Sequence, residues 1–231
     1  MKKKSTCVHC GTSVDRFLQS GLLGCTNCYT TFLTSREIDL FSRSSLNCLV
    51  NPIPITYSLN ESIKICKKHE FSIRFRLARN FRNQFYSPDK NSLTYRKMDE
   101  LLNLPAIQNF NQYGMLHFFD EDHVRAEFYL QSIDCDKNQF PEIFYDTSIF
   151  DYHSEYGFLT SCPTNSGMGN KISIGIDYSK VSRERLIKIN SNFDKNIINN
   201  GKNNFYIFIK NYKKKDLLSF LNLFLKIFSE T

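Results

Sequence analysis

The sequence has no apolar run long enough to cross a membrane, and its longest one is Leu217–Phe228. Ser219, Asn222 and Lys226 interrupt that run, which falls short of the roughly 20 residues that a transmembrane helix needs. No apolar signal segment follows the polar start at Met1–Lys4. We therefore expect a soluble protein of the reducing cytoplasm, where disulfides are the weaker interpretation of the cysteines.

Other absences exclude further protein classes. The sequence contains no phosphate-binding loop of the form G-x-x-x-x-G-K-S/T and no internal repeat. With 41% hydrophobic and 23% charged residues among 231, the chain is neither disordered nor fibrous. Its net charge of +7 favours an anionic partner, which can be nucleic acid, a phosphate ligand or an acidic protein surface.

Four of the eight cysteines form two C-x-x-C pairs. Each pair can bend into a knuckle turn that offers two thiolates to one tetrahedral metal ion. Because four cysteines leave no coordination position open, we expect a structural Zn²⁺ that holds a fold rather than one that activates water. A pair of redox dithiols is the alternative interpretation. The predicted zinc ligands are Cys7, Cys10, Cys25 and Cys28.

Residues next to these pairs refine the prediction. Gly11 follows the first pair and Gly24 precedes the second, as suits tight turns that often require a positive φ. His9 lies inside the first pair and is an alternative ligand, although four cysteines already complete the coordination. Burial is the default expectation for cysteines without a motif, which are Cys48, Cys66 and Cys135.

The segment Asn51-Pro52-Ile53-Pro54 separates this module from the rest of the chain, since the residue before a proline is pushed out of the α region. We expect a zinc module and linker at residues 1–49 and a larger domain at 50–231. Within the linker, Thr30–Leu49 is predicted as a short helix or irregular chain. Alternating β-branched and aromatic residues predict strands at Met115–Phe119, Val124–Leu130, Ile172–Ile176 and Asn204–Ile209. Helices are predicted at Leu93–Leu104, Ser182–Asn196 and Lys215–Glu230, which gives an α+β class.

Three segments carry candidate chemistry. In the first, Arg74 and Arg76 project from one face if the segment is extended, as a polyphosphate would require, although such a strand is more often a solvated face. The second, Asp120–Arg125, packs three carboxylates, an imidazole and a guanidinium into six positions, and by itself it can be an acidic surface turn. The third places Cys162 at the start of a tight turn rich in backbone amides.

Together these segments resemble the phosphagen (guanidino) kinase family, most closely its bacterial protein arginine kinase branch. The family signature S-x-R-x-R-L-A-R-N matches Ser72–Asn80, and N-E-E-D-H-L-R matches Asp120–Arg125. The signature L-T-S-C-P-T-N-x-G-T-G matches Leu159–Gly169, with Met168 in place of threonine. The cysteine module is similar to the zinc-binding activator protein that accompanies the bacterial arginine kinase.

The resemblance implies a shortened phosphagen kinase catalytic domain, with an antiparallel sheet and helices, that transfers a phosphoryl group from ATP to an arginine guanidinium with the help of Mg²⁺. Glu121 would orient the guanidinium and accept its proton, and Cys162 would face it as a thiolate. Asp122, His123 and Asn165 would support the motif loops. The ATP phosphates would be held by Arg74, Arg76, Arg125 and Lys171.

The chain also departs from the family. Lys171 stands where a phosphate-binding arginine is expected, and lysine keeps the charge but loses the planar fork. The family loop R-G-x-x-G-E is replaced by Asn199-Asn200-Gly201, and Asn103–Tyr113 lacks the histidine expected near the nucleotide. We therefore expect an enzyme of reduced activity. The alternative is an inactive kinase-like regulator or adaptor that binds nucleotide, phosphoarginine or a partner kinase.

A nucleic-acid-binding zinc ribbon is a different class to consider. The basic runs Lys2–Lys4 and Lys213–Lys215 lie at opposite ends of the chain, and no strand of basic and aromatic residues accompanies the cysteines. We therefore expect an arginine-containing protein substrate or a partner kinase, rather than nucleic acid or a membrane. The sequence leaves the oligomeric state open.

Overall fold

The structure, a computed structural model, describes residues 6–33, 57–86, 92–130, 139–193, 196–201, 203–212 and 214–229. Cys48, Cys135, the basic run Lys2–Lys4 and the predicted boundary between residues 49 and 50 lie outside these residues, as does the predicted linker beyond residue 33. Within the described ranges, no helix is both long enough and apolar enough to span a membrane.

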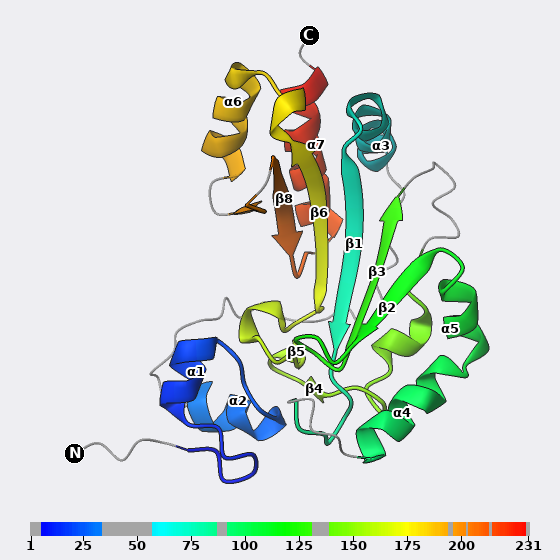
Figure 1. Cartoon of the computed structure of the whole chain (residues 1–231), viewed down its shortest axis with the longest axis vertical. Coiled ribbons are helices and arrows are strands. Elements are labelled where there is room, and N and C mark those ends of the chain that lie inside the picture. The colour runs from blue at the N-terminus through cyan, green and yellow to red at the C-terminus, as the bar shows by residue number, and fades with distance from the viewer. Residues whose placement is uncertain are drawn as a thin grey trace. The chain divides into compact units, whose positions relative to one another are not determined.

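Helices and strands follow one another irregularly along the chain (Figure 1). The α-helices are α1 (Val14–Ser20), α2 (Thr26–Leu33), α3 (Tyr57–His69), α4 (Ser92–Leu102), α5 (Pro105–Phe110), α6 (Arg183–Phe193) and α7 (Lys214–Ser229). The strands are β1 (Ser72–Arg79), β2 (Gly114–Phe118), β3 (Val124–Leu130), β4 (Tyr152–His153), β5 (Gly157–Phe158), β6 (Asn170–Asp177), β7 (Ile197–Asn199) and β8 (Asn204–Lys210). Short 3-10 helices are η1 (Glu142–Tyr145), η2 (Pro163–Asn165) and η3 (Tyr178–Lys180).

Six strands form one sheet in the order β2-β3-β1-β6-β8-β7. Strand β8 pairs antiparallel with both β6 and β7, so that Ile207 lies opposite Ile174 on one side and Ile197 on the other. Strands β4 and β5 form a separate antiparallel pair. The predicted α+β class with an antiparallel sheet is confirmed.

The predicted strands correspond to β2, β3, β6 and β8, and two of the predicted helices correspond to α6 and α7. The helix predicted at Leu93–Leu104 corresponds to α4, which ends at Leu102, and a short helix that the sequence does not predict, α5, begins beyond it at Pro105. Proline has no N–H to continue the preceding helix, but its fixed φ suits the first position of a new one. Pro105 therefore separates α5 from the predicted helix.

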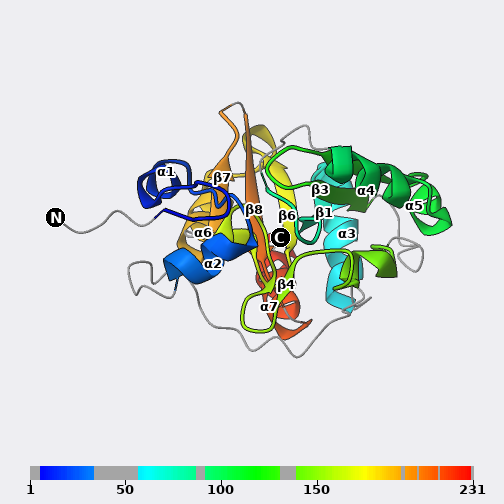
Figure 2. The ribbon, with the colours of Figure 1, turned by 90° about the horizontal axis from the view of Figure 1, so that it is seen from below.

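Helix α3 has no counterpart among the predicted elements. Its buried face combines Leu59, Ile63 and Cys66 with two serines, which interrupt the apolar period of 3.6 residues. The Ser58 hydroxyl donates a hydrogen bond of 2.5 Å to the Asn222 side chain on α7, and α3 packs beside α7 (Figure 2). Serine thus serves as a packing residue at this helix contact, and hydropathy alone does not reveal the helix.

The chain folds into two compact units, each assembled from separate stretches of sequence. Unit 1 comprises Met1–Val50, Leu77–Ala126 and Pro141–Gly169, and unit 2 comprises Asn51–Arg76, Glu127–Phe140 and Asn170–Thr231. Strands β1 and β3 each contribute residues to both units.

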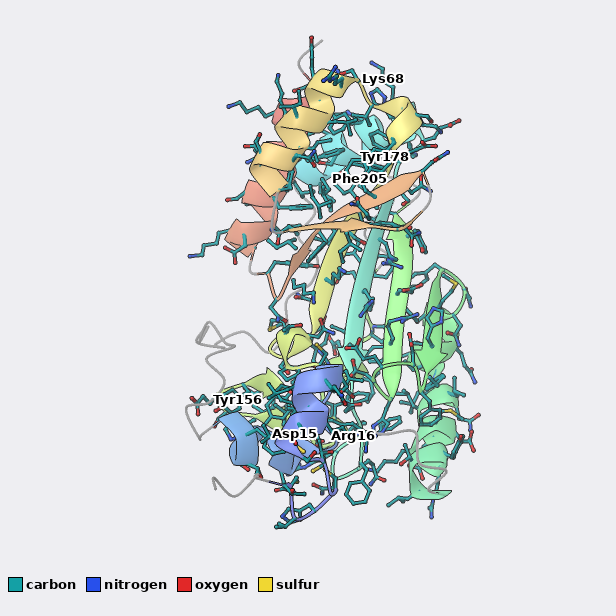
Figure 3. All side chains as sticks on the ribbon, turned by 60° about the vertical axis from the view of Figure 1, so that its left-hand side comes forward. Asp15, Arg16, Lys68, Tyr156, Tyr178 and Phe205 are labelled. Carbon is teal, nitrogen blue, oxygen red and sulfur yellow. The ribbon has the colours of Figure 1, made fainter. Side chains whose placement is uncertain are left out.

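Aromatic side chains fill the core of unit 2. The fully buried ring of Phe75 on β1 stacks on Phe128 of β3, with 5.3 Å between the ring centroids. At another point of this unit, Tyr178 packs on Phe205 of β8 at 4.6 Å (Figure 3). Such ring pairs combine a large apolar area with a defined geometry, so they hold the strands in register.

We predict that Phe75→Ala lowers the free energy of unfolding by about 3–5 kcal/mol, because it removes a fully buried ring and leaves a cavity. Denaturant unfolding followed by circular dichroism measures this change. The control is Ile187→Ala on α6, whose side chain is largely exposed and whose loss should change stability by about 0.5 kcal/mol or less. Equal losses in the two variants would contradict the packing described here.

Candidate functional site

The four cysteines of the two C-x-x-C pairs converge in unit 1, with all Sγ atoms within 4.8 Å of one another. The Sγ atoms of Cys7 and Cys25 lie 3.7 Å apart, and those of Cys10 and Cys28 lie 3.4 Å apart. Ligand sulfurs around a tetrahedral zinc with bonds of about 2.3 Å are separated by about 3.8 Å. The hydrogen bond with Cys28 lowers the pKa of Cys25 to about 5, which favours a thiolate in the cluster. The donor set fits a structural zinc.

The turns around the cysteines require their glycines. Gly11 has a φ of +73°, a left-handed conformation that glycine adopts without strain. A Cβ at Gly24 would lie 2.8 Å from the Cys10 Sγ and would collide with the Thr12 hydroxyl, so only glycine leaves room for the cluster. His9 is exposed, and the cluster found among the described residues consists of the four cysteines alone.

The buried carboxylate of Asp122 joins all three motif segments in unit 1. Its Oδ1 accepts a hydrogen bond of 2.9 Å from the Asn80 side chain and one of 2.6 Å from the Ser161 backbone N–H. Asn80 in turn accepts the His123 backbone N–H at 2.8 Å through its Oδ1. Burial raises the pKa of Asp122 to about 6, although these hydrogen bonds oppose the shift.

The imidazole of His123 is buried and neutral. Its Nδ1 accepts the Phe81 backbone N–H at 3.0 Å, which leaves Nε2 to carry the proton and to donate to the Phe85 carbonyl at 2.7 Å. Burial lowers the pKa of His123 to about 4. His123 therefore holds the Phe81–Phe85 chain against the acidic loop and does not act as a cation at neutral pH.

Glu121 lies beside the turn that carries Cys162. The Asn165 side chain donates a hydrogen bond of 2.8 Å to the Glu121 carboxylate, and the Cys162 Sγ lies 3.1 Å from the Thr164 hydroxyl. Both Glu121 and Cys162 are half-buried, so each remains accessible to a ligand. This turn, residues 160–166, is called the Cys162 loop below.

Arg79 anchors the chain that follows the Cys162 loop. Its guanidinium is completely buried, donates to the Phe144 carbonyl at 2.6 Å and to the Met168 carbonyl at 3.0 Å, and lies 3.8 Å from the centre of the Phe158 ring. A Cβ at Gly169 would collide with this guanidinium, which explains the glycine. Burial lowers the pKa of Arg79 to about 9, so it is still charged at neutral pH. Its role is structural.

Three of the four candidate phosphate ligands already have protein partners. In unit 1, Arg125 forms an ion pair with Asp120. In unit 2, the Arg74 guanidinium lies 3.7 Å from the carboxylate of buried Glu127, and the Lys171 ammonium lies 4.2 Å from the centre of the Phe208 ring. Arg74 and Arg76 alternate on β1 with buried residues, so both lie on the other face of the strand.

A cavity of about 640 Å³ in unit 1 opens onto the acidic loop. The carboxylates of Asp120 and Glu121 and the ring of Phe85 line one part of it. Other lining residues belong to the zinc module and include His9 and Arg16, the latter on α1 (Figure 3). The cavity therefore presents both negative and positive groups to a ligand.

The structure thus brings several predicted site residues together in unit 1: Glu121, Asp122, His123, Asn165 and Cys162, with Arg125 on the adjoining strand. Arg74, Arg76 and Lys171 belong to unit 2. Sequence reasoning missed the contribution of Asn80, although it ends the first signature. It also missed Glu127, although an acidic residue inside an otherwise apolar strand is a sequence signal that could have pointed to it.

Comparison with known proteins bears on the zinc module first. Residues 5–38 match a family model described as the McsA central zinc-finger domain. A search of curated proteins found no significant match. The N-terminal part of the chain is therefore similar to the McsA zinc-finger domain.

Solved structures define the class of the fold. The chain is similar to a lombricine kinase, with a TM-score of 0.57 and 13% identity over 98% of this chain and 85% of that one. It is also similar to the duplicated taurocyamine kinase from Schistosoma mansoni with bound transition-state analogue components, with a TM-score of 0.57 and 14% identity. That match covers 90% of this chain but only 40% of the kinase. At such low identity the likeness establishes the fold alone, which is that of the guanidino kinases.

We predict that Asp122→Asn changes the pH dependence of stability. Because the folded-state pKa of Asp122 is raised to about 6, the folded protein holds a proton that the unfolded chain releases at about pH 4. The stability that this bound proton contributes is therefore fully present below about pH 4 and is lost as the pH rises through 6. Relative to the variant, the wild type should lose about 2–3 kcal/mol of its free energy of unfolding between pH 4 and 7.

Urea unfolding at a series of pH values measures this difference. The opposite contribution of His123, whose lowered pKa makes stability rise with pH, is present in both proteins and cancels in the comparison. Parallel stability profiles for the wild type and Asp122→Asn would contradict the burial of a proton on Asp122.

Proposed function

We propose that the protein transfers the γ-phosphoryl group of ATP to an arginine guanidinium, with an arginine-containing protein as the acceptor. The observation that carries the proposal is the connection of Glu121 to the Cys162 loop through Asn165, at the edge of a cavity, in a chain with the guanidino kinase fold. Phosphoryl transfer of this kind depends on positioning and on offsetting charge, and the hydrogen bonds around Asp122 supply rigid positioning.

Glu121 is the residue proposed to orient the acceptor. A carboxylate can receive two parallel N–H bonds from a guanidinium and can take the proton that the attacking nitrogen loses. Asn165 fixes the carboxylate from one side and leaves its other lone pairs for the ligand. Cys162, half-buried and beside Thr164, would contact the same guanidinium.

Arg74, Arg76, Arg125 and Lys171 are proposed to hold the ATP phosphates, because guanidinium forks match phosphate oxygens and lysine adds a point charge. Mg²⁺ would supply charge neutralisation between the phosphates when bound. Arg74 and Arg125 must exchange their present carboxylate partners for phosphate oxygens. This exchange makes phosphate binding weaker than it would be with unpaired arginines.

The ion pairs also favour a second candidate function, an inactive kinase-like protein that binds nucleotide, phosphoarginine or a partner kinase. A buried carboxylate at Glu127 next to Arg74 opposes the approach of a triphosphate. Together with Lys171 in place of arginine, it is the specific feature that reduces the expected rate of transfer.

With ATP, Mg²⁺ and an unfolded arginine-rich protein, we predict formation of an acid-labile phosphoramidate. Glu121→Gln and Cys162→Ala should each lower the rate by about two to four orders of magnitude, because both groups act on the reacting guanidinium. Phosphorus NMR or phosphopeptide mapping under neutral conditions detects the product.

The matched control is Glu142→Gln, which alters an exposed glutamate of the same unit and should leave the rate unchanged. Binding of ATP without phosphoryl transfer would contradict the enzyme proposal and favour the inactive regulator. Equal rates in the wild type and Glu121→Gln would remove Glu121 from the mechanism.

A further prediction concerns nucleotide binding. Glu127→Gln removes the negative charge beside Arg74, so we expect ATP to bind about tenfold more tightly, with a smaller gain for ADP. Isothermal titration calorimetry measures both affinities. Glu184→Gln on α6 is the control, since that glutamate is exposed. Unchanged or weaker ATP binding in Glu127→Gln would argue against a phosphate site at Arg74.

A further inference from the structure

The zinc module, residues 6–33, shares its hydrophobic core with the kinase-like part of unit 1. Tyr86, which precedes α4 in the chain, and Leu159, which precedes the Cys162 loop, are buried in one cluster with the module. From the module this cluster contains Cys7, Phe17, Leu23, Cys25, Cys28, Tyr29 and Phe32. Metal ligands thus belong to the same packed cluster as Leu159, which adjoins the Cys162 loop, and Tyr86, which lines the cavity beside Glu121.

Tyr29 connects the metal centre to the Cys162 loop directly. It follows the ligand Cys28 in the sequence and is completely buried. Its hydroxyl donates to the Thr160 carbonyl at 2.6 Å, accepts the Thr160 N–H at 3.1 Å and contacts the Ser166 hydroxyl. One side chain of the module therefore holds both ends of the loop that carries Cys162.

Backbone hydrogen bonds add to this connection. The Leu23 N–H donates to the Ser161 carbonyl at 2.7 Å, and the Tyr86 N–H donates to the Gly24 carbonyl at 2.8 Å. Leu23 and Gly24 immediately precede the ligand Cys25, and the Ser161 N–H is a donor to Asp122. The peptide between the two C-x-x-C pairs is thus bonded to the network that positions the acidic loop.

The cavity beside Glu121 depends on the same contacts. Cys10 and Thr12, from the first metal turn, line it together with Arg16, Asp120 and Glu121. If the metal is lost, the four cysteine side chains lose the ion that holds them together, and the turns that carry Cys10 and Thr12 lose their shape. The part of the cavity lining that these turns supply would then be lost.

We propose that metal binding at the four cysteines and guanidinium binding at the Glu121 cavity are coupled, with Tyr29 as the positioning residue that links the metal centre to the Cys162 loop. The binding of a guanidinium at the Glu121 cavity rests on the proposed function, whereas the link from the metal centre through Tyr29 to the Cys162 loop does not. Coupling between two sites is reciprocal, so a bound guanidinium must also retain the metal.

Hydrogen exchange of the backbone amides tests the link without any assay of activity. In Tyr29→Phe with its metal bound, the amides of residues 160–166 should exchange about tenfold faster than in the wild type, because the ring stays buried while the hydroxyl bonds are lost. Removal of zinc by a chelator should have the same effect. Tyr57→Phe is the matched control, since Tyr57 is largely exposed on α3. Metal analysis of each sample should find about one zinc per chain before chelation.

Calorimetry with Nα-acetyl-arginine amide tests the coupling itself. We expect the dissociation constant to rise about tenfold on zinc removal, and to rise in zinc-loaded Tyr29→Phe but not in Tyr57→Phe. If the backbone amides of residues 160–166 exchange at the wild-type rate in Tyr29→Phe, the proposal is overturned. This outcome decides the question even if the protein unfolds when zinc is chelated. If the amide fails to bind the zinc-loaded wild type, the proposed function fails, and the exchange result still decides whether the module holds the loop.

Discussion

The candidate site depends on one buried carboxylate, that of Asp122. A carboxylate removed from water is costly unless hydrogen bonds replace its hydration, and Asn80 and the Ser161 amide supply them. These two donors come from the end of β1 and from the Cys162 loop, while Asp122 itself lies between β2 and β3. Satisfying this single group therefore fixes three loops that are distant in sequence, and Glu121 takes its position from the same loop.

The cations of the molecule divide into two kinds by their surroundings. Arg79 is completely buried among carbonyl oxygens and an aromatic ring, and no carboxylate of the described residues is its hydrogen-bond partner, so its charge stabilises a loop. Arg74 and Arg125 are partly exposed and face carboxylates, so their partners can be exchanged. Exposure and the kind of partner thus distinguish a structural arginine from a candidate ligand-binding one, even though Arg74 and Arg79 lie on one strand.

Sequence patterns predict local structure, but they do not predict contacts between residues that are far apart in the chain. Alternation over Val124–Leu130 predicts β3 correctly, and the spacing of the cysteines predicts their convergence, because both depend on neighbours in the chain. Helix α3 is missed because serines occupy its packing face. The role of Tyr29 is missed for another reason: its partner Thr160 is 131 residues away, and no periodicity marks such a pair. The pairing of Arg74 with Glu127 is equally invisible before the strands are placed.

The zinc module packs as an integral part of unit 1. A segment of fewer than about 40 residues buries too little apolar surface to be stable without help, so it needs a metal ion or a core shared with other segments. Here Tyr86 and Leu159 complete the core of the module, and Thr26 donates a hydrogen bond of 2.5 Å to the Asp151 carboxylate. The same contacts supply the Cys162 loop with partners that its own segment lacks. Each part therefore uses the other to complete its core, and selection for a stable module constrains the geometry of the candidate site as well.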